Sequence, residues 1–511
     1  MTIIKQNRVT VWYQPDGEGN AFSVLGIGEK GVGMTGKSIP GSDRSPVYGR
    51  DSGGRPIVIA QNESPPGDSP SATIQLYERG GVDFLLKALQ GGCPINVQTR
   101  ANSCGSLNNP NAWDYIEHWS SGKITDYSPG DAPSIEFAGE NIVNEGTFSF
   151  QHVIRILRTS LSSLTTTETM NLLGITGLSD ETCNECNVGY PGADKILFVG
   201  AAADAAAEAN VLYTTNGGSS WAATSAAPFS AGNYEDATYI DCFFVSKDQI
   251  RVLIGTGSSV VGTKAQTAWA DVTLGAEGTT SWTVVTLSGT ATGDTITAMK
   301  ALSYDRVMAA SAGDIYLSED QGASYGATAL YTGSTAINGF AIAPDGEEAW
   351  AFGASNLILR ELNTSGLFEA RVGPSGGGAF TAMTVAGNGF VYAGNGTSIY
   401  VTKNKAANAG GWTSLKDFGS NKVVKAIQCI GGDRALGGDS QLLRVVVDDT
   451  AGGNGTIWES FDGGASWQQV TALTNLGYNA AYFSQVDDNR AVVVGDAVGG
   501  YGVIHNLAPS A

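Results

Sequence analysis

The chain has 511 residues, of which 69 are glycine and 15% are charged, and 49 acidic residues against 29 basic ones give a formal net charge of −20. This length exceeds one ordinary core and predicts two or more domains, and the Gly-rich composition favours a mostly β protein with many tight turns. The acidic balance argues against a surface that binds nucleic-acid phosphates. The sequence shows neither a signal peptide nor a run long enough for a membrane helix, so a soluble chain made in a cytoplasm is expected.

The first third of the chain reads as strands around one helix. Alternating apolar residues and turn signals predict the strands, and the apolar face of residues 82–90, stopped by Gly91 and Gly92, predicts the helix. Residues 33–70 are rich in Gly, Ser and Pro and read as a long loop with one strand inside. The expected strands are 9–13, 21–26, 56–60, 72–77, 94–100, 123–127, 134–137 and 147–157.

Residues 191–511 carry a repeat, and each copy has about the length of one four-stranded unit. An Asp or Asn turn precedes an apolar, small-residue strand seven times, at spacings of 40 to 57 residues, and a third strand follows each. A fourth follows in six units, whereas the seventh ends at Ala511 without one. The connector before Gly192 is therefore expected to lend the missing strand and close a ring. The turn residues are Asp194, Asp248, Asp305, Asp345, Asn388, Asp433 and Asp488.

A second motif marks the turn after the third strand. Residues 460–467 read SFDGGASW, and residues 214–221 (TTNGGSSW) and 318–325 (SEDQGASY) keep the hydroxyl, the Asp or Asn, the Gly and the aromatic at the same offsets. The Asp or Asn side chain accepts backbone N–H groups of its own turn, the Gly takes a left-handed conformation, and the aromatic is buried between sheets. Residues 363–368 have lost this pattern, and the turn after Asn404 carries an insertion before Trp412.

This motif resembles the Asp-box of the sialidase-type (BNR-type) β-propellers. The resemblance implies a β-propeller of seven blades, with six as the alternative, in which the box is a folding device at the rim, away from the central binding face. The N-terminal third resembles, in the order of its elements, the small β-sandwich or barrel of phage tail-tube subunits. That likeness implies stacked, hexameric rings whose sheets join into an acidic conduit through which DNA passes without being held.

Two glycine patterns near the N-terminus match sequence motifs of nucleotide-binding sites. Residues 31–38 fit G-x-x-x-x-G-K-S, and Gly26, Gly28 and Gly31 fit the dinucleotide pattern. Both patterns need a helix that begins at the loop, because its N–H groups hold the phosphate. Pro40 and Gly41 follow at once, so we interpret the stretch as a Gly-rich loop.

Catalysis and metal binding find little support in the residue inventory. Four arginines recur at one position of the repeat, which indicates a structural role in pairing with turn acids at the rim, and three histidines are too few for a Ser/His or His-metal centre. A reduced thiol or disulfide is favoured over zinc for the cysteines, and acidic turns are favoured over calcium sites. Tyr234, Tyr239 and Tyr478 could stack on sugars or pack the blades. The arginines are Arg251, Arg306, Arg434 and Arg490, and the histidines are His118, His152 and His505. The cysteines are Cys93, Cys104, Cys183, Cys186, Cys242 and Cys429. One acidic turn contains Asp448, Asp449 and Asn454, and the other contains Asp487, Asp488 and Asn489.

The sequence thus predicts a mostly β chain with a tail-tube-like domain over residues 1–165, a connector over 166–190 and an Asp-box propeller over 191–511. The expected function is that of a phage virion protein in the tail, assembled in the host cytoplasm, with the propeller facing outward and available to bind host glycans. Its expected partners are copies of itself, other tail proteins and passing DNA. No enzyme activity, cofactor, metal site or membrane insertion is expected. The alternatives are a carbohydrate-binding surface or secreted propeller and a glycoside hydrolase.

Overall fold

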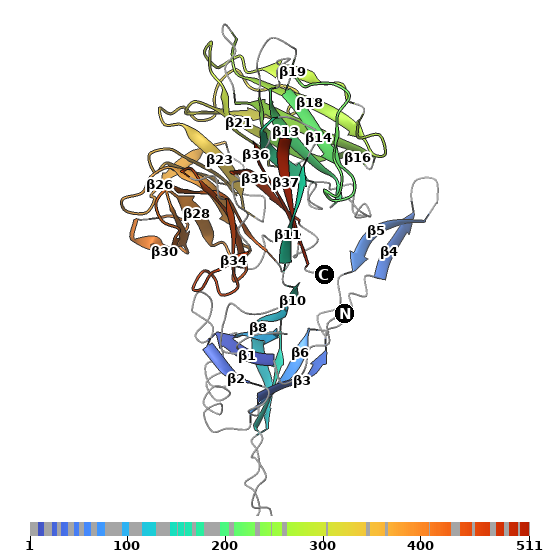
Figure 1. Cartoon of the computed structure of the whole chain (residues 1–511), viewed down its shortest axis with the longest axis vertical. Helices are drawn as coiled ribbons and strands as arrows, with labels where there is room; N and C mark the ends of the chain where they lie inside the picture. Colours follow the sequence, from blue (N-terminus) through green and yellow to red (C-terminus); the bar gives the residue numbers. More distant parts are fainter. Residues whose placement is uncertain are drawn as a thin grey trace, which may run out of the picture. The chain divides into compact units, whose positions relative to one another are not determined.

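The computed structural model is nearly all β, and its named strands form antiparallel sheets (Figure 1). Beside these strands, the named helical element of the described residues is a short 3-10 helix, Ala409–Gly411. Within these residues no helix is both long and apolar enough to cross a bilayer. The structure describes residues 9–14, 23–27, 32–38, 45–50, 56–62, 69–76, 95–101, 115–128, 144–150, 152–157, 159–165, 170–177, 195–203, 209–229, 236–246, 248–257, 263–278, 280–302, 305–343, 348–362, 366–407, 409–430, 440–451, 455–470, 477–484, 490–498 and 501–509.

The chain divides into two compact units, with residues 1–158 forming most of the first and residues 159–509 most of the second. The first contains an eight-stranded antiparallel sheet in the order β2-β1-β7-β8-β9-β6-β3, with β10 also paired to β8, and a separate hairpin of β4 and β5. These strands are β1 Val9–Gln14, β2 Ser23–Ile27, β3 Val32–Ser38, β4 Ser45–Arg50, β5 Pro56–Asn62, β6 Ser71–Leu76, β7 Ile95–Ala101, β8 Tyr115–Ser128, β9 Asn144–Ser149 and β10 His152–Leu157.

The long strand β8 pairs with both β7 and β10 before Gly122 and with β9 after it. Gly122 pairs with Ile95 of β7, and the next residue, Lys123, pairs with Ser149 of β9. A Cβ at Gly122 would lie 2.3 Å from the Phe150 ring, so the missing side chain makes room for this ring in the core. Buried apolar side chains complete that core: Val11, Ala72, Ile74, Ile95, Val97, Trp119 and Phe148.

Several N-terminal predictions need correction. The expected strand 147–157 is divided into β9 and β10, which both pair with β8, and Phe150 between them is buried in the core. The expected loop 33–70 contains β3 and β4 in addition to the predicted strand, and 123–127 is the second half of β8. The predicted helix 82–90 and the predicted strand 134–137 lie outside the described residues.

The second unit contains seven small antiparallel sheets in its described residues. Their first strands follow one another around a closed ring, since β12, β16, β20, β23, β27, β31 and β35 each contact the next and β35 contacts β12. This is the arrangement of a β-propeller. The first four sheets consist of β12 Leu172–Gly177, β13 Leu197–Ala203, β14 Ala209–Thr214 and β15 Ala222–Ala223; β16 Ala237–Ser246, β17 Gln249–Thr256, β18 Gln266–Thr273 and β19 Thr283–Thr286; β20 Ile296–Ala301, β21 Val307–Ser311 and β22 Asp314–Ser318; and β23 Ile337–Ile342, β24 Glu348–Gly353, β25 Ile358–Leu362 and β26 Phe368–Arg371.

The ring is closed by a strand from the N-terminal side of the repeat. Strand β11, Thr159–Thr165, pairs with β37 along its whole length and completes the seventh sheet (Figure 1). The donated strand is thus confirmed, and it lies before the expected connector 166–190, so the second unit begins at residue 159. The remaining sheets consist of β27 Phe380–Val385, β28 Val391–Asn395, β29 Ser398–Thr402 and β30 Trp412–Asp417; β31 Lys422–Cys429, β32 Leu443–Asp449, β33 Thr456–Ser460 and β34 Gln468–Val470; and β35 Tyr478–Phe483, β36 Ala491–Val498 and β37 Tyr501–Pro509 with β11.

The third sheet departs from the predicted pattern, because it has three strands among the described residues. In place of an outer strand, an isolated bridge joins Ile315 to Tyr331. The backbone N–H groups of Gly326 and Leu330 still donate to Leu317 O and Ile315 O. The outer segment therefore follows β22 without forming a continuous ladder.

The repeat turns 214–221, 318–325 and 460–467 adopt the geometry that the sequence predicts. In the second, Asp320 Oδ1 accepts the backbone N–H of Ser324 at 2.8 Å, and the glycine at the fifth position, Gly322, has a φ of 82°. Tyr325 is buried in a cluster with Phe243 and Leu253 of the neighbouring sheet. The turn that begins at Thr402 keeps the left-handed backbone although Lys405 and Ala406 replace the glycines.

Candidate functional site

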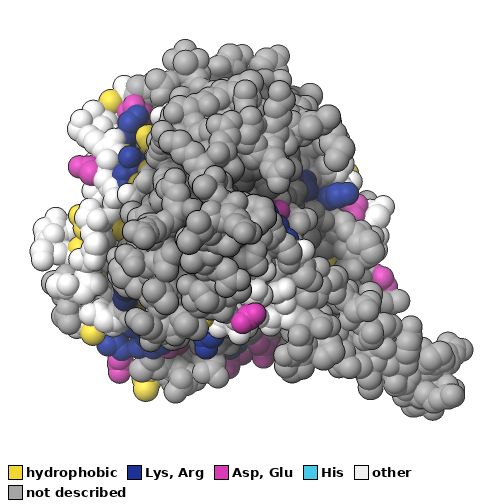
Figure 2. Space-filling view, turned by 90° about the horizontal axis from the view of Figure 1, so that it is seen from below, with side chains coloured by type: hydrophobic (Ala, Val, Ile, Leu, Met, Phe, Trp, Pro, Cys, Tyr) yellow, Lys and Arg dark blue, Asp and Glu magenta, His cyan; other side chains and the backbone are white. Residues whose placement is uncertain are grey.

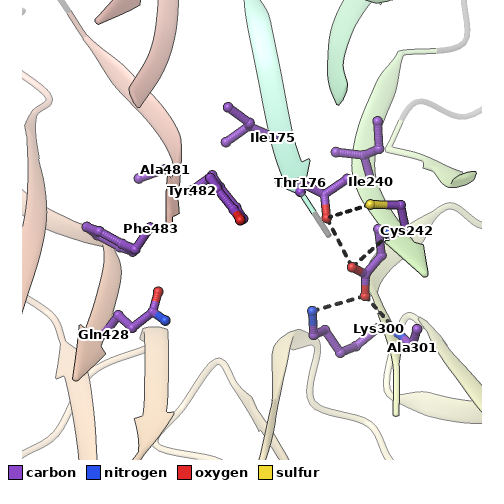
Figure 3. Close-up of a pocket in the computed structure, with 12 residues that line it drawn as sticks. Ile175, Thr176, Ile240, Cys242, Lys300, Ala301, Gln428, Ala481, Tyr482 and Phe483 are labelled. Atoms are coloured by element: carbon purple, nitrogen blue, oxygen red, sulfur yellow. Dashed lines mark hydrogen bonds and ion pairs between the residues drawn. The ribbon is translucent and has the colours of Figure 1, made fainter. Parts of the chain in front are cut away.

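A cavity of about 240 Å3 lies at the centre of the ring (Figure 3). Its lining comes from the first strands of five sheets: Ile175, Thr176 and Gly177 of β12, Ile240, Asp241 and Cys242 of β16, Lys300 and Ala301 of β20, Gln428 of β31, and Ala481, Tyr482 and Phe483 of β35. Because these strands converge on the ring axis, side chains more than 300 residues apart in the sequence share one small space.

The cavity lies at the end of the sheets from which the repeat turns leave. Gly177 of β12 pairs with Leu197 of β13, which pairs with Thr214, the first residue of the first repeat turn. In the third sheet, Ala301 pairs with Val307 and Val307 with Ser318 in the same way. From the sequence we expected a central binding face away from the repeat turns, whereas this cavity lies at the same end of the ring as those turns.

Asp241 holds three sheets together at this cavity. Its carboxylate accepts hydrogen bonds from Thr176 Oγ1 at 3.1 Å, from the backbone N–H of Cys242 at 3.0 Å and from the backbone N–H of Ala301 at 2.9 Å. Lys300 Nζ lies 3.0 Å from Asp241 Oδ2. The ammonium group thereby balances a carboxylate whose side chain is 7% exposed, and the two charges cancel.

Cys242 is a buried thiol beside this pair, with its Sγ 3.8 Å from Thr176 Oγ1. Burial, and after it the nearby Asp241 carboxylate, raises the pKa of the thiol well above its ordinary value. The thiolate is the reactive form, so Cys242 is inert at neutral pH. Cys429 is also a buried thiol, whereas Cys93, Cys104, Cys183 and Cys186 lie outside the described residues.

Two of the repeated arginines, Arg251 and Arg306, pair with acids other than the predicted turn acids. Arg251 pairs with Asp271 on strand β18 at 2.7 Å and lies 4.0 Å over the Trp269 ring. Arg306 pairs with Glu361 on β25 of the next sheet at 3.0 Å. In both cases the acid is on a strand rather than in a turn.

Arg251 and Arg490 also reach a repeat turn of the next sheet around the ring. Arg251 Nη1 donates to Gln321 O, and a Cβ at Gly217 would lie 1.2 Å from Arg490 Nη2. The glycine of the repeat turn thus makes space for a guanidinium from the neighbouring sheet. Arg434 lies outside the described residues.

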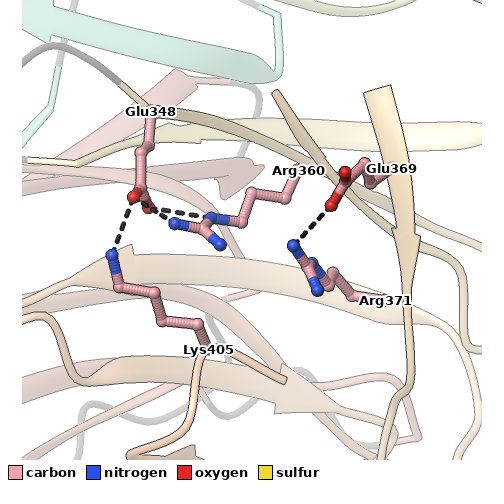
Figure 4. Close-up of polar contacts among 5 residues, drawn as sticks. All are labelled: Glu348, Arg360, Glu369, Arg371 and Lys405. Carbon is pink, nitrogen blue, oxygen red and sulfur yellow. Dashed lines mark hydrogen bonds and ion pairs between the residues drawn. The ribbon is translucent and has the colours of Figure 1, made fainter. Parts of the chain in front are cut away.

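The fourth sheet carries the opposite charge at this position. Glu348 begins β24 and receives Arg360 of its own sheet and, at 2.7 Å, Lys405 from the turn of the next sheet (Figure 4). Burial alone would raise the pKa of Glu348, but the hydrogen bonds from Arg360 and Lys405 outweigh it and hold the pKa below its ordinary value. Arg371 and Glu369 form a separate pair on β26.

The described acids of the first acidic turn, Asp448 and Asp449, are engaged with neighbouring groups. Asp448 Oδ1 accepts the backbone N–H of Tyr478 at 3.1 Å, and Asp449 pairs with Lys422 at 2.5 Å. In the part of the chain that the structure describes, no three or more His, Cys, Asp or Glu side chains come together as metal ligands. Asn454 and residues 487–489 lie outside it.

The glycine pattern at residues 31–38 falls mostly on strand β3, which pairs with β6. It is therefore a strand rather than the predicted loop. Lys37 pairs with Glu117 and lies 5.9 Å over the Trp119 ring. A phosphate loop needs a helix after the lysine, and here a lysine on a strand is used in an ion pair.

Two of the three histidines and two of the three singled-out tyrosines can be placed. His118 is buried and hydrogen-bonded to Gln98, and His505 is buried with its Nδ1 3.0 Å from the Tyr478 hydroxyl. Tyr478 is thus a core residue, and Tyr239 is partly buried against the core between the second and third sheets. The tyrosine that does face the cavity is Tyr482, which no local sequence signal distinguishes (Figure 3). Tyr234 and the side chain of His152 lie outside the described residues.

No protein-family model matches the chain, and no curated protein matches it. Solved structures with which it shares 12–14% identity include YCF48 bound to D1 peptide (TM-score 0.46, covering 68% of this chain and 97% of that one) and YCF48 from Cyanidioschyzon merolae (0.46, 68% and 99%). Another is a catalytically inactive virginiamycin B lyase from Staphylococcus aureus with quinupristin (0.48, 69% and 99%). The propeller assignment rests on the ring of sheets itself.

Proposed function

We propose that the chain is a phage virion structural protein. In this proposal the first unit is a tail-tube subunit that assembles with copies of itself into stacked rings around passing DNA. The second unit, a seven-bladed Asp-box propeller, is an outward module that contacts host glycans. Such a protein works in the virion tail with other tail proteins and has no enzyme activity.

The observation that carries the proposal is that the sheet of the first unit has two end strands. Among the described residues, β2 pairs with β1 and β3 pairs with β6, and these two strands end the sheet order without pairing to each other. An end strand presents backbone N–H and C=O groups that another chain can pair with. Two such edges on one subunit are what a closed ring of subunits requires, because each copy must pair on both sides.

The second unit supports a structural role in a different way. Charged contacts of Arg306 and Glu348 join neighbouring sheets. In the face drawn in Figure 2, acidic and basic side chains of the described residues lie close to one another. The net charge of −20 also suits a particle along which DNA slides.

Sedimentation velocity of the full chain tests the assembly. We expect a species much heavier than the 52.8 kDa monomer. Gly33→Pro in β3 should return the chain to monomers, because proline has no N–H and disrupts the edge. Val284→Pro makes the same change in β19, an outer strand of the second unit, and should leave assembly intact. A wild-type chain that stays monomeric at high concentration would overturn the proposal and favour a carbohydrate-binding surface or secreted propeller.

Measuring the release of sugar distinguishes the glycoside hydrolase alternative from the proposed structural role. A hydrolase releases reducing sugar from a glycan, whereas a display module binds without releasing it. We expect no release above the buffer control when the full chain is incubated with bacterial surface polysaccharide. Sustained release that scales with protein concentration would contradict the structural role.

A further inference from the structure

The central cavity has a rigid wall that presents hydrogen-bond donors. The Asp241 carboxylate accepts from four donors, including Lys300 Nζ. A carboxylate offers about four acceptor positions, so Asp241 is saturated. The ammonium of Lys300 has three N–H donors, and its side chain is 41% exposed while Asp241 fixes its position. The wall therefore offers donors held in place by a buried acid.

The opposite wall adds an amide and an aromatic ring. The amide of Gln428 and the hydroxyl of Tyr482 point toward the space between the two walls (Figure 3). A Cβ at Gly177 would lie 2.6 Å from Tyr482 Cε2 and 2.5 Å from Leu197 Cδ2. The absence of a side chain at Gly177 thus permits the Tyr482 ring to occupy the cavity wall.

The chemistry of these walls restricts the ligand. The Asp241 and Lys300 charges cancel, so a fully charged ligand would gain little and would lose its hydration. Several donors and one aromatic ring suit a neutral molecule that is rich in hydroxyl oxygens. The volume of about 240 Å3 is below the roughly 300–1,000 Å3 of drug-sized sites, which limits the occupant to about one ring.

We propose that this cavity binds a single neutral sugar ring, with the Lys300 ammonium and the Gln428 amide donating to its hydroxyl oxygens and Tyr482 beside its apolar face. This inference names the site at which the propeller contacts a glycan, and it therefore rests on that part of the proposed function. The same chemistry could come from a free monosaccharide or from the end residue of a surface glycan. Copies displayed along a tube would turn a weak single contact into firm attachment.

Titration calorimetry and ligand-detected NMR on the full chain test the site with free glucose, galactose and N-acetylglucosamine, with glucuronate as the charged comparison. We expect a millimolar dissociation constant for at least one neutral sugar and weaker binding of glucuronate. Gln428→Met touches none of the Asp241 contacts and should weaken binding by about 10-fold, as should Tyr482→Leu. Lys264→Met, which changes a lysine outside the cavity, should leave binding unchanged.

Two results would overturn the proposal. One is that none of the neutral sugars binds, either free or at the end of a short oligosaccharide. The other is that binding survives both cavity variants, which would place the sugar elsewhere. Binding of the oligosaccharide but not of the free sugar would support the site and identify a glycan end as the source. Sugar binding and self-assembly are measured in separate experiments. Failure of this proposal can therefore be distinguished from failure of the proposed assembly.

Discussion

Two neighbouring junctions in the ring use the same position with opposite charge. Between the third and fourth sheets, Arg306 reaches Glu361, and between the fourth and fifth, Glu348 reaches Lys405. In both, a residue beside the start of the second strand of one sheet contacts a charged group at the third strand or turn of the next. The difference teaches that at these two junctions the charges are complementary while their signs are exchanged.

The largest effect is expected where the acid is most buried. Arg306→Met should lower the free energy of unfolding by about 3–5 kcal/mol, because it leaves the Glu361 carboxylate, 1% exposed, without its cation. Urea unfolding measures the change. The double variant Arg306→Met with Glu361→Gln should recover part of the loss, and a single-variant loss below about 1 kcal/mol would show that the pair does not stabilise the junction.

The seventh sheet offers a neutral counterpart, the buried pair of Tyr478 and His505. Burial lowers the pKa of His505 from 6.5 to about 4, so between these pH values the unfolded chain binds a proton that the folded chain does not. Stability should therefore fall as the pH drops below 6.5, with a contribution of about 3 kcal/mol by pH 4. His505→Asn should flatten this part of the profile in thermal melts. An unchanged profile would assign the acid sensitivity to other groups.

Reversing the charge of the second junction should have a smaller effect. Glu348→Arg places three cations together, but Lys405 is 45% exposed and can turn toward solvent. We expect a loss of about 2 kcal/mol, reduced by added salt because salt screens like charges. Glu348→Gln serves as the control and should lose less than the reversal. Equal losses for both variants would mean that packing rather than charge matters here.

The smallest effect concerns the repeat turn 214–221, whose Gly217 lies beside Arg490 of the seventh sheet. Asn216 Oδ1 accepts the backbone N–H of Ser220 at 3.0 Å. Asn216→Ala should cost about 1 kcal/mol, and Asn216→Asp should cost less because the acceptor remains. Chemical denaturation of both variants checks the order. A loss of the same size in Asn216→Asp would show that the acceptor does not hold the turn.

The sequence could predict what is local and not what joins distant segments. The repeat turns were predictable because Asp320 and Ser324 are close in sequence, and the closing strand because the seventh unit lacked one. The partner of Arg306 was not predictable, since Glu361 is 55 residues away on another sheet. Likewise Thr176 and Asp241, 65 residues apart, meet because β12 and β16 are neighbouring inner strands of the ring. The strand break after Phe150 was hidden because the alternating pattern of the sequence continues through it.

Negative-stain electron microscopy of the purified full-length chain tests the central claim most directly. If the chain is a tail-tube subunit with a displayed propeller, the images will show rings or hollow tubes with regularly spaced knobs. Discrete particles of the size of one chain, at every concentration tried, would contradict it.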